Sequence, residues 1–355
     1  MKRFKNKKVY KTLIALLVIL AIIGPYYAFK QHEEMKTTPS YSLSLIQAAI
    51  KEHDTKTFYQ HFDTKSFFAL AFDNVIRPIV LPPEVDTYND FFKDILDSIQ
   101  QTFISSMETY TNYYIKTGST STARKIENQN FAKRFIDLTH IYNLKYQKIE
   151  SVKIDGENAL ITLIAYNKNL DKDFKVQFEM LQLEDKTWKV ISFANINSYL
   201  DEVQKNVKEK VAILNKPLIK ELDEEVTLIS NDYGFHTYNR YGVSHTIFYS
   251  PTYKFHSSKT ISTLKAKVKY FNKKGKKVFE QSYILSGPFA KNGIKSFSFD
   301  WILNPYTKKG QDLIKLKKSD LTVKCQIDKL EYKDGSTLAL YTDVPGNLDL
   351  EDEEF

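Results

Sequence analysis

The sequence predicts an α+β protein: one membrane-spanning helix, then a domain of helices on an antiparallel sheet, then an all-β domain. An uncharged apolar block follows a lysine-rich start, and helical spacing of apolar residues covers much of residues 41–142. From residue 144 onward, short segments with two-residue alternation dominate, apart from one charged helix. At 355 residues and 42% apolar composition, the chain is long enough for two soluble domains with packed cores.

The membrane segment is predicted at residues 12–29, which read TLIALLVILAIIGPYYAF without a charge. Eighteen helical residues span about 27 Å, close to the roughly 30 Å thickness of the hydrocarbon core. Residues 1–11 carry six basic residues and no acid, so we expect a cytoplasmic N-terminus and exported domains, a single-pass arrangement in the cell membrane. A cleaved signal peptide is the alternative, but cutting after Gly24 or Ala28 lacks the usual pattern of small residues.

The composition adds three expectations. The single cysteine, Cys325, excludes an intrachain disulfide framework. No Asn-x-Ser/Thr acceptor site occurs, which favours a bacterial cell envelope over a secreted animal protein. The 24 Phe and 23 Tyr residues predict cores, or a cavity within them, lined by aromatic rings.

The first exported domain is predicted at residues 41–205, after a linker at 30–40. Apolar residues at four-residue spacing, such as Leu45 and Ala49, indicate short helices. Asp54 and Asp63 each precede a helical run, so we expect them to cap helices rather than act in catalysis.

In the rest of this domain the spacing of apolar residues changes from that of helices to that of strands. After a loop marked by Pro78, Pro82 and Pro83, a long helix covers about residues 89–116, and a further helix covers 131–142. We expect the long helix to bury one face, formed by Phe91, Ile95, Ile99, Phe103 and Met107. Residues 144–194 contain segments in which apolar and polar residues alternate, separated by turn signals at Asp155-Gly156 and Asp185-Lys186. This pattern predicts a meander of antiparallel strands.

The order of helices followed by a curved sheet indicates helices that cover one sheet face. Ala48-Ala49-Ile50, His53-Asp54, Phe62-Asp63 and Trp188-Lys189-Val190 resemble an uncharacterised bacterial family of membrane-anchored proteins. The exported domain of that family resembles the nuclear transport factor two cone. The resemblance implies a pocket between helices and sheet and brings no catalytic residues with it.

A charged connector helix is predicted at residues 206–225, followed by a β-sandwich at 226–345 and an acidic tail at 346–355. Leu264, Ala266, Val268 and Tyr270 alternate with lysines, and Leu321, Val323, Cys325 and Ile327 share one parity. YFNKKGKKV, SGPF and KLEYKDGST are similar to small immunoglobulin-like envelope domains of the FxLYD type. Cys325 is then expected to be a core side chain rather than a nucleophile.

Charge is unequally distributed between the two exported domains. Residues 226–345 hold 20 basic and nine acidic residues, whereas residues 30–225 hold 25 basic and 29 acidic residues. A basic exported domain predicts binding to anionic lipid or an acidic cell-surface polymer, and export argues against nucleic acid. The alternative is that these lysines only solvate the outer face and protect edge strands.

No catalytic, cofactor-binding or metal-ligating residue is predicted. His236, His245 and His256 lie nine and eleven residues apart, which is not a ligand spacing, and we expect His53 and His61 to be exposed or hydrogen-bonded. We therefore expect a non-enzymatic envelope protein whose cone binds a small apolar ligand or peptide, while the basic sandwich docks a partner. A purely structural tethered module and an enzyme that uses polar residues inside the cone are the alternatives.

Overall fold

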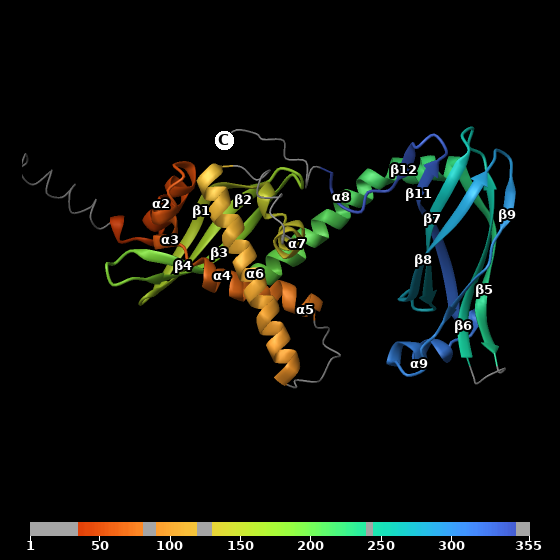
Figure 1. Cartoon of the computed structure of the whole chain (residues 1–355), viewed down its shortest axis with the longest axis horizontal. Helices are drawn as coiled ribbons and strands as arrows, with labels where there is room; N and C mark the ends of the chain where they lie inside the picture. Colours follow the sequence, from red (N-terminus) through yellow and green to blue (C-terminus); the bar gives the residue numbers. More distant parts are fainter. Residues whose placement is uncertain (1–34, 81–89, 119–129, 239–243, 346–355) are drawn as a thin grey trace, which may run out of the picture. The chain divides into compact units, whose positions relative to one another are not determined.

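The computed structural model of the protein describes residues 35–80, 90–118, 130–238 and 244–345 (Figure 1). It contains helices and three antiparallel sheets, so the prediction of an α+β chain is confirmed. The chain divides into two compact units whose boundary lies between Val207 and Lys208. The first unit holds the described residues up to Val207 together with Val344 and Pro345, and the second holds Lys208–Asp343.

The predicted membrane segment at residues 12–29 lies outside the described residues. None of the helices in the described ranges is long and apolar enough to span a bilayer.

The first unit begins with short helices joined by tight caps. They are α2 (Pro39–Lys51), α3 (Thr55–His61), α4 (Thr64–Ala71), the π-helical η1 (Phe72–Ile76) and α5 (Arg77–Val80). The Asp54 carboxylate accepts a hydrogen bond from the Thr57 amide at 3.1 Å, and Asp63 accepts one from Ser66 at 3.1 Å. Both predicted caps are confirmed, since each aspartate satisfies an amide in the first turn of its helix.

Two predictions about the helical part are wrong. Pro78 lies inside α5 rather than in a loop. The π-helical η1 runs directly into α5, so the proline, which has no N–H, follows a widened helical turn. In α6 (Asp90–Thr117), Phe103 and Met107 are buried, but Ile95 is 39% exposed and Leu96 takes its place in the core. The side chain of Phe91 and the loop residues Pro82 and Pro83 lie outside the part of the chain that the structure describes.

The helical part ends with α7 (Asn130–Thr139) and the 3₁₀ turn η3 (Ile141–Asn143), and a four-stranded sheet follows. Its strands are β1 (Leu144–Asp155), β2 (Asn158–Asn167), β3 (Lys172–Gln182) and β4 (Trp188–Phe193), paired in the order β1-β2-β3-β4. This confirms the predicted meander. Gly156 and Lys186 adopt positive φ angles of 60° and 69° at the two predicted turns.

The helices pack on one face of this sheet (Figure 1). Phe174, Val176 and Met180 of β3 are buried on that face, while Lys175 and Glu179 between them are exposed. The other face is polar: Lys175 forms an ion pair with Glu150 at 2.7 Å. The sheet therefore has the half-buried alternation of an antiparallel layer covered on one side.

The helix α8 (Ile196–Glu225) carries residues of both units. It is one continuous helix of 30 residues and begins before the predicted connector. Tyr199, Leu200 and Val203 are buried at its start, Leu222 is buried near its end, and Ile213 between them is 60% exposed. Its two ends thus contribute to different hydrophobic cores.

The second unit consists of two four-stranded antiparallel sheets. One sheet has the order β10-β6-β5, with β9 also paired to β6, and the other has the order β12-β11-β7-β8 (Figure 1). The strands are β5 (Val226–Tyr238), β6 (Ser244–Phe255), β7 (Ile261–Asn272), β8 (Lys277–Phe289), β9 (Ile294–Ser296), β10 (Phe299–Ile302), β11 (Leu321–Tyr332) and β12 (Thr337–Ala339).

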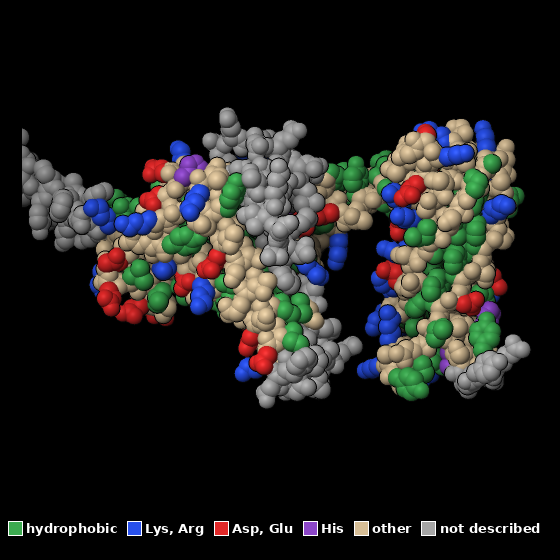
Figure 2. Space-filling view, viewed as in Figure 1, with side chains coloured by type: hydrophobic (Ala, Val, Ile, Leu, Met, Phe, Trp, Pro, Cys, Tyr) green, Lys and Arg blue, Asp and Glu red, His purple; other side chains and the backbone are tan. Residues whose placement is uncertain are grey.

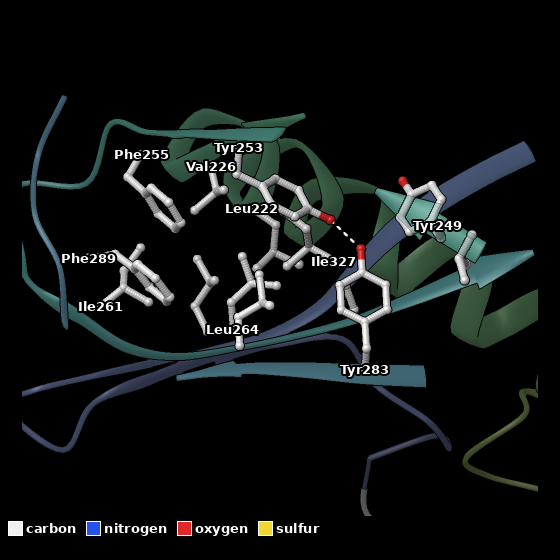
Figure 3. Packing of buried hydrophobic residues seen from close by; sticks show 14 of the residues in the cluster. Leu222, Val226, Tyr249, Tyr253, Phe255, Ile261, Leu264, Tyr283, Phe289 and Ile327 are labelled. Atoms are coloured by element: carbon white, nitrogen blue, oxygen red, sulfur yellow. Dashed lines mark hydrogen bonds between the residues drawn. The ribbon is translucent and has the colours of Figure 1, made fainter. Parts of the chain in front are cut away.

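Both sheets contribute to one hydrophobic core (Figure 3). Tyr253 and Phe255 from β6 lie in the same cluster as Leu264 from β7, and the rings of Phe255 and Phe289 stack with centroids 4.4 Å apart. Two sheets that enclose a shared core form the layered arrangement of a β-sandwich. The second unit also contains α9 (Lys308–Ile314) and the 3₁₀ turn η4 (Lys318–Asp320), neither of which the sequence predicts.

Candidate functional site

The strongest candidate site is a row of lysines on the outer face of the β12-β11-β7-β8 sheet. Leu264, Ala266, Val268 and Tyr270 of β7 are at most 1% exposed, so the alternating Lys265, Lys267 and Lys269 point to the opposite face. Successive lysines on one face of a strand lie about 7 Å apart. β7 therefore presents a ladder of three positive charges.

The neighbouring strand β11 extends this ladder. Lys269 lies opposite Lys324 and Lys265 lies opposite Lys329, so like charges face each other across the strand pair. Such pairs destabilise a sheet unless they are neutralised. We call Lys265, Lys267, Lys269, Lys324 and Lys329 the lysine face.

Acidic residues neutralise this face only in part. Glu331 contacts two lysines at once, Lys329 at 2.8 Å and Lys265 at 3.5 Å. The hydrogen bond from Lys329 lowers the pKa of Glu331, which keeps this carboxylate charged. Lys267 lies 4.0 Å from Asp328, whose pKa is raised mainly because the carboxyl is partly buried. Five lysines thus share two carboxylates on β11 and the carboxylate of Glu280, which lies opposite Lys269 on β8.

Two further contacts define the surroundings of the face. The Lys324 ammonium lies 5.7 Å from the centre of the Phe271 ring, within the range of a cation–π contact. On β8, Ile284 lies opposite Lys265 and is 59% exposed. Figure 2 shows Lys and Arg side chains gathered along the side of the second unit where Figure 1 places β8.

The strand order bears on the alternative that these lysines protect an edge. β7 lies between β11 and β8, so both of its edges are hydrogen-bonded. Edge protection needs charged residues on a strand with an unpaired edge. Lys265, Lys267 and Lys269 do not have that position. Edge protection therefore does not explain them, which favours a binding role for the outer face of the sheet.

Cys325 lies near three buried tyrosines of the sandwich core. Figure 3 shows these tyrosines, Tyr249, Tyr253 and Tyr283. The Tyr253 and Tyr283 hydroxyls are 2.5 Å apart, and they lie 3.2 Å and 3.1 Å from the Cys325 sulfur. Tyr249 is fully buried, and its hydroxyl interacts with the same sulfur. The prediction that Cys325 packs in the core is confirmed.

Burial is also the main electrostatic effect in this cluster. It raises the pKa of Tyr249, Tyr253 and Tyr283 well above the ordinary tyrosine value, because a phenolate would be poorly solvated there. These hydroxyls therefore stay neutral at physiological pH. The cluster is a hydrogen-bonded core rather than a source of a reactive phenolate.

The structure separates the three histidines of the second unit. Thr237 of β5 pairs with His245 of β6, so His236 lies one residue away but on the opposite face. His256 follows β6 at the other end of the pair, where its amide bonds to Glu225. No group of three or more histidine, cysteine or acidic residues in the described ranges is placed to hold a metal.

His236 has a local environment that its spacing in the sequence does not reveal. Its Nδ1 lies 3.3 Å from Asp300 Oδ1, and its ring stacks on Phe248 with centroids 4.2 Å apart. Thr246 Oγ1 donates to the same carboxylate oxygen at 3.4 Å. In this arrangement the carboxylate lies between the histidine and the hydroxyl, so the imidazole is not placed to activate the hydroxyl as a nucleophile.

The two histidines of the first unit are both hydrogen-bonded. A ring nitrogen of His53 lies 2.7 Å from the Ile115 carbonyl oxygen, and one of His61 lies 3.2 Å from the Trp188 carbonyl oxygen. His61 is only 3% exposed, and His53 adopts a positive φ of 60°. Their contacts tie the short helices to α6 and β4, so the prediction of hydrogen-bonded histidines is confirmed.

Aromatic rings contact one another through the interior of the first unit, where a ligand pocket is predicted. The contacts run from α3 through α4 and α6 to α7, with centroid distances between 4.9 and 6.4 Å. The rings involved are Phe58, Phe62, Phe67, Phe68, Phe103 and Phe135. The predicted abundance of interior rings is thus confirmed, and these rings pack against each other.

Searches against protein-family models and curated proteins found no match to this chain.

Proposed function

We propose that this protein is a non-enzymatic, membrane-tethered binding protein of the cell envelope whose second unit docks onto an anionic cell-surface polymer through the lysine face. The supporting observation is the ladder of lysines on the internal strand β7, opposite further lysines on β11. A flexible polyanion can follow charges repeated about every 7 Å without a shaped pocket. Its binding is then dominated by screened electrostatic attraction.

Finer assignments of the two units belong to the same proposal. The first unit is a cone of the nuclear transport factor two type, and the second is an immunoglobulin-like sandwich. The ring-to-ring contacts of the first unit favour a structural role for it over the binding of an apolar ligand. It then acts as a spacer that carries the sandwich.

The tether in this proposal is residues 12–29, with the N-terminus in the cytoplasm. A reporter enzyme that works only outside the cytoplasm, fused after Phe355, is expected to be active. The matched control is a second fusion with a reporter that works only inside. Activity of the inside reporter alone would overturn the envelope placement.

Binding is tested with the full chain reconstituted in nanodiscs of neutral lipid. Inorganic polyphosphate serves as the probe, and its affinity is measured by light scattering or interferometry over a range of NaCl concentrations. We expect the triple variant Lys265→Gln, Lys267→Gln and Lys269→Gln to bind about tenfold or more weakly, since each exposed charge contributes up to about 1 kcal/mol. The dependence of affinity on salt should also become shallower.

The control removes three exposed lysines from α8, with the substitutions Lys205→Gln, Lys208→Gln and Lys216→Gln. Both triple variants have the same net charge, so a general charge effect weakens both equally. A lower affinity in the β7 variant alone supports the lysine face. Equal losses, or no binding by the parent chain, would overturn the proposal.

A further inference from the structure

Two apolar side chains protrude from the end of the second unit that holds α9. Tyr306 is 92% exposed and Ile302 is 78% exposed, the two largest values among the exposed large apolar residues of the described ranges. Leaving such side chains in water is unfavourable, so a surface that buries them would be stabilised. Figure 2 shows hydrophobic side chains at the surface of this end of the unit, where Figure 1 places α9.

The local structure holds Tyr306 in this exposed position. The Tyr306 amide donates to the Asn304 side chain at 2.9 Å, and the Gly310 amide donates to the Thr307 hydroxyl, which caps α9, at 3.1 Å. A Cβ atom on Gly310 would lie 1.8 Å from the Asn304 carbonyl oxygen. The chain therefore makes a tight, specific turn around Tyr306, and the tyrosine does not protrude because of a loose loop.

Lysines are abundant in the segments at this end of the second unit. Residues 302–320 contain five lysines and two acids, and the β7–β8 turn at residues 272–277 adds four lysines and no acid. An ion pair between Lys273 and Asp320, 2.8 Å long, joins this turn to η4. Lys318 also pairs with Asp232, and Lys277 pairs with Glu280. These nine lysines are therefore set against four carboxylates, and the end of the sandwich remains basic. We call Ile302, Tyr306, Lys308, Lys309, Lys273, Lys274 and Lys276 the basic tip.

The combination of charge and protruding apolar groups points to a lipid surface. Tyrosine is favoured at the level of the lipid headgroups, and lysines near an anionic bilayer are attracted to it. A stable protein interface needs roughly 800 Å² of complementary surface on each partner. Two side chains on a narrow end do not supply that, whereas a bilayer adapts to them.

We propose that the basic tip docks on a bilayer with anionic headgroups, with Ile302 and Tyr306 inserted into the interfacial region. This site is separate from the lysine face. It gives the second unit a contact with membrane that does not depend on the predicted N-terminal helix.

The test places a fluorescent reporter at the tip. The Tyr306→Trp variant of the full chain is reconstituted in nanodiscs, and quenching of tryptophan emission by brominated lipid is compared with that of the parent. Bromine is placed either in the nanodisc lipid or in added vesicles, which distinguishes docking on the chain's own bilayer from docking on a second one. We expect the variant to be quenched at least threefold more than the parent with anionic phosphatidylglycerol lipid, and not with phosphatidylcholine alone.

Matched variants separate the tip from other exposed surfaces. Ile213→Trp places the reporter on α8 at a side chain that is 60% exposed, and we expect no added quenching there. Adding Lys308→Glu and Lys309→Glu to Tyr306→Trp should remove most of the quenching. The β7 triple substitution should leave the quenching of Tyr306→Trp unchanged. A failure of membrane docking by the basic tip can therefore be distinguished from a failure of polymer binding by the lysine face.

Three outcomes would overturn the proposal. The first is the absence of added quenching in both lipid arrangements with anionic lipid. The second is equal quenching by neutral lipid, which indicates simple apolar adsorption. The third is a blue shift in the tryptophan emission of the Tyr306→Trp variant that grows with protein concentration in the absence of anionic lipid, which indicates that a second copy covers the tip.

Discussion

At the scale of single residues, the first unit depends on side chains that satisfy backbone groups. Asp63 caps α4, and its neighbour Val190 accepts a hydrogen bond from the Asp63 amide at 2.8 Å. The same residue therefore starts a helix and joins it to β4. A carboxylate in this position is explained without any catalytic role.

Replacing this cap should weaken the first unit. Asp63→Ala is expected to lower its free energy of unfolding by about 1 kcal/mol, because the Ser66 amide and hydroxyl lose their acceptor. Urea unfolding followed by the emission of Trp188, in a Trp301→Phe background, measures the change. Asp63→Asn is the control, since asparagine caps equally well, and a loss of equal size in both variants would contradict the capping role.

The buried tyrosines of the second unit predict sensitivity to alkaline pH. Burial raises the pKa of Tyr249, Tyr253, Tyr270 and Tyr283 in the folded chain, so the unfolded chain releases these protons first as the pH rises. Stability is therefore complete below about pH 10 and falls above it. Each tyrosine contributes a loss of up to about 1.4 kcal/mol at pH 11.

Urea unfolding of the second unit between pH 8 and pH 11.5 checks this dependence. The signal is the Trp301 emission, obtained by subtracting the Trp301→Phe variant from the parent. Tyr283→Phe removes one titrating group, so its stability should fall less steeply with pH than that of the parent. A free energy of unfolding that stays constant between pH 9 and pH 11 would rule out this account.

At the scale of secondary-structure elements, the end of the last strand is joined to α8 by one side chain. The Asn215 amide nitrogen donates to the Tyr341 carbonyl at 2.9 Å, and its oxygen accepts from the Tyr341 amide at 2.8 Å. Asn215 is only 8% exposed. The Asn215 side chain thus bonds to both backbone groups of Tyr341, as a neighbouring strand would.

Asn215→Ala should destabilise the second unit by about 1–2 kcal/mol, since both hydrogen bonds are lost and alanine offers no replacement. The Trp301 difference signal in urea again measures this change. Lys216→Ala, at the adjacent exposed position, is expected to change stability by less than about 0.5 kcal/mol. Equal effects of the two substitutions would indicate a general weakening of α8 instead.

Elements with a regular pattern could be predicted from the sequence, but the exact buried face of α6 could not. Four residues advance about 400° around a helix, so the predicted series of positions drifts by about 40° at each step. Residues from Phe91 to Met107 at constant spacing therefore cannot all share one face. The structure resolves this by burying Leu96 in place of Ile95. The helix α9 could not be predicted because it has only seven residues, too few for a periodic pattern. The close approach of Gly310 to the Asn304 backbone, which accompanies this helix, also has no periodic signal.

The lysine face was predictable on β7 and only partly on β11. Alternation assigns Lys265, Lys267 and Lys269 to one face directly. On β11, a register shift between Ile327 and Lys329 reverses the parity, so Lys329 and Glu331 join the outer face and Leu330 is fully buried. Strict alternation from Cys325 would place Lys329 in the core. A β-bulge of this kind has no clear signal in a single sequence.

At the scale of the whole molecule, the two units have separate cores, and α8 carries residues of both. Tyr199 and Val203 of α8 are buried in the first unit, and Leu222 belongs to the core of the second. The helix between them buries little, as the 60% exposure of Ile213 illustrates. The residues buried at the two ends of α8 therefore belong to different cores.

We accordingly expect the units to unfold independently. Leu264→Ala removes a fully buried side chain of the second unit and should lower the stability of that unit by about 2–5 kcal/mol, because it leaves a cavity. Ile161→Ala does the same in the first unit. The emission of Trp188 and the Trp301 difference signal, one tryptophan in each unit, follow the two transitions separately.

Each substitution should shift only the transition of its own unit, which makes the pair of variants a reciprocal control. If Leu264→Ala also moved the Trp188 midpoint, and Ile161→Ala the Trp301 midpoint, α8 would have to transmit stability along its exposed middle. In that case a helix-breaking Ala212→Gly substitution, at an exposed position between the two buried ends, should separate the transitions again. Independent transitions in the parent chain would instead establish the second unit as a module that can engage a polymer or a bilayer while the first unit stays unchanged.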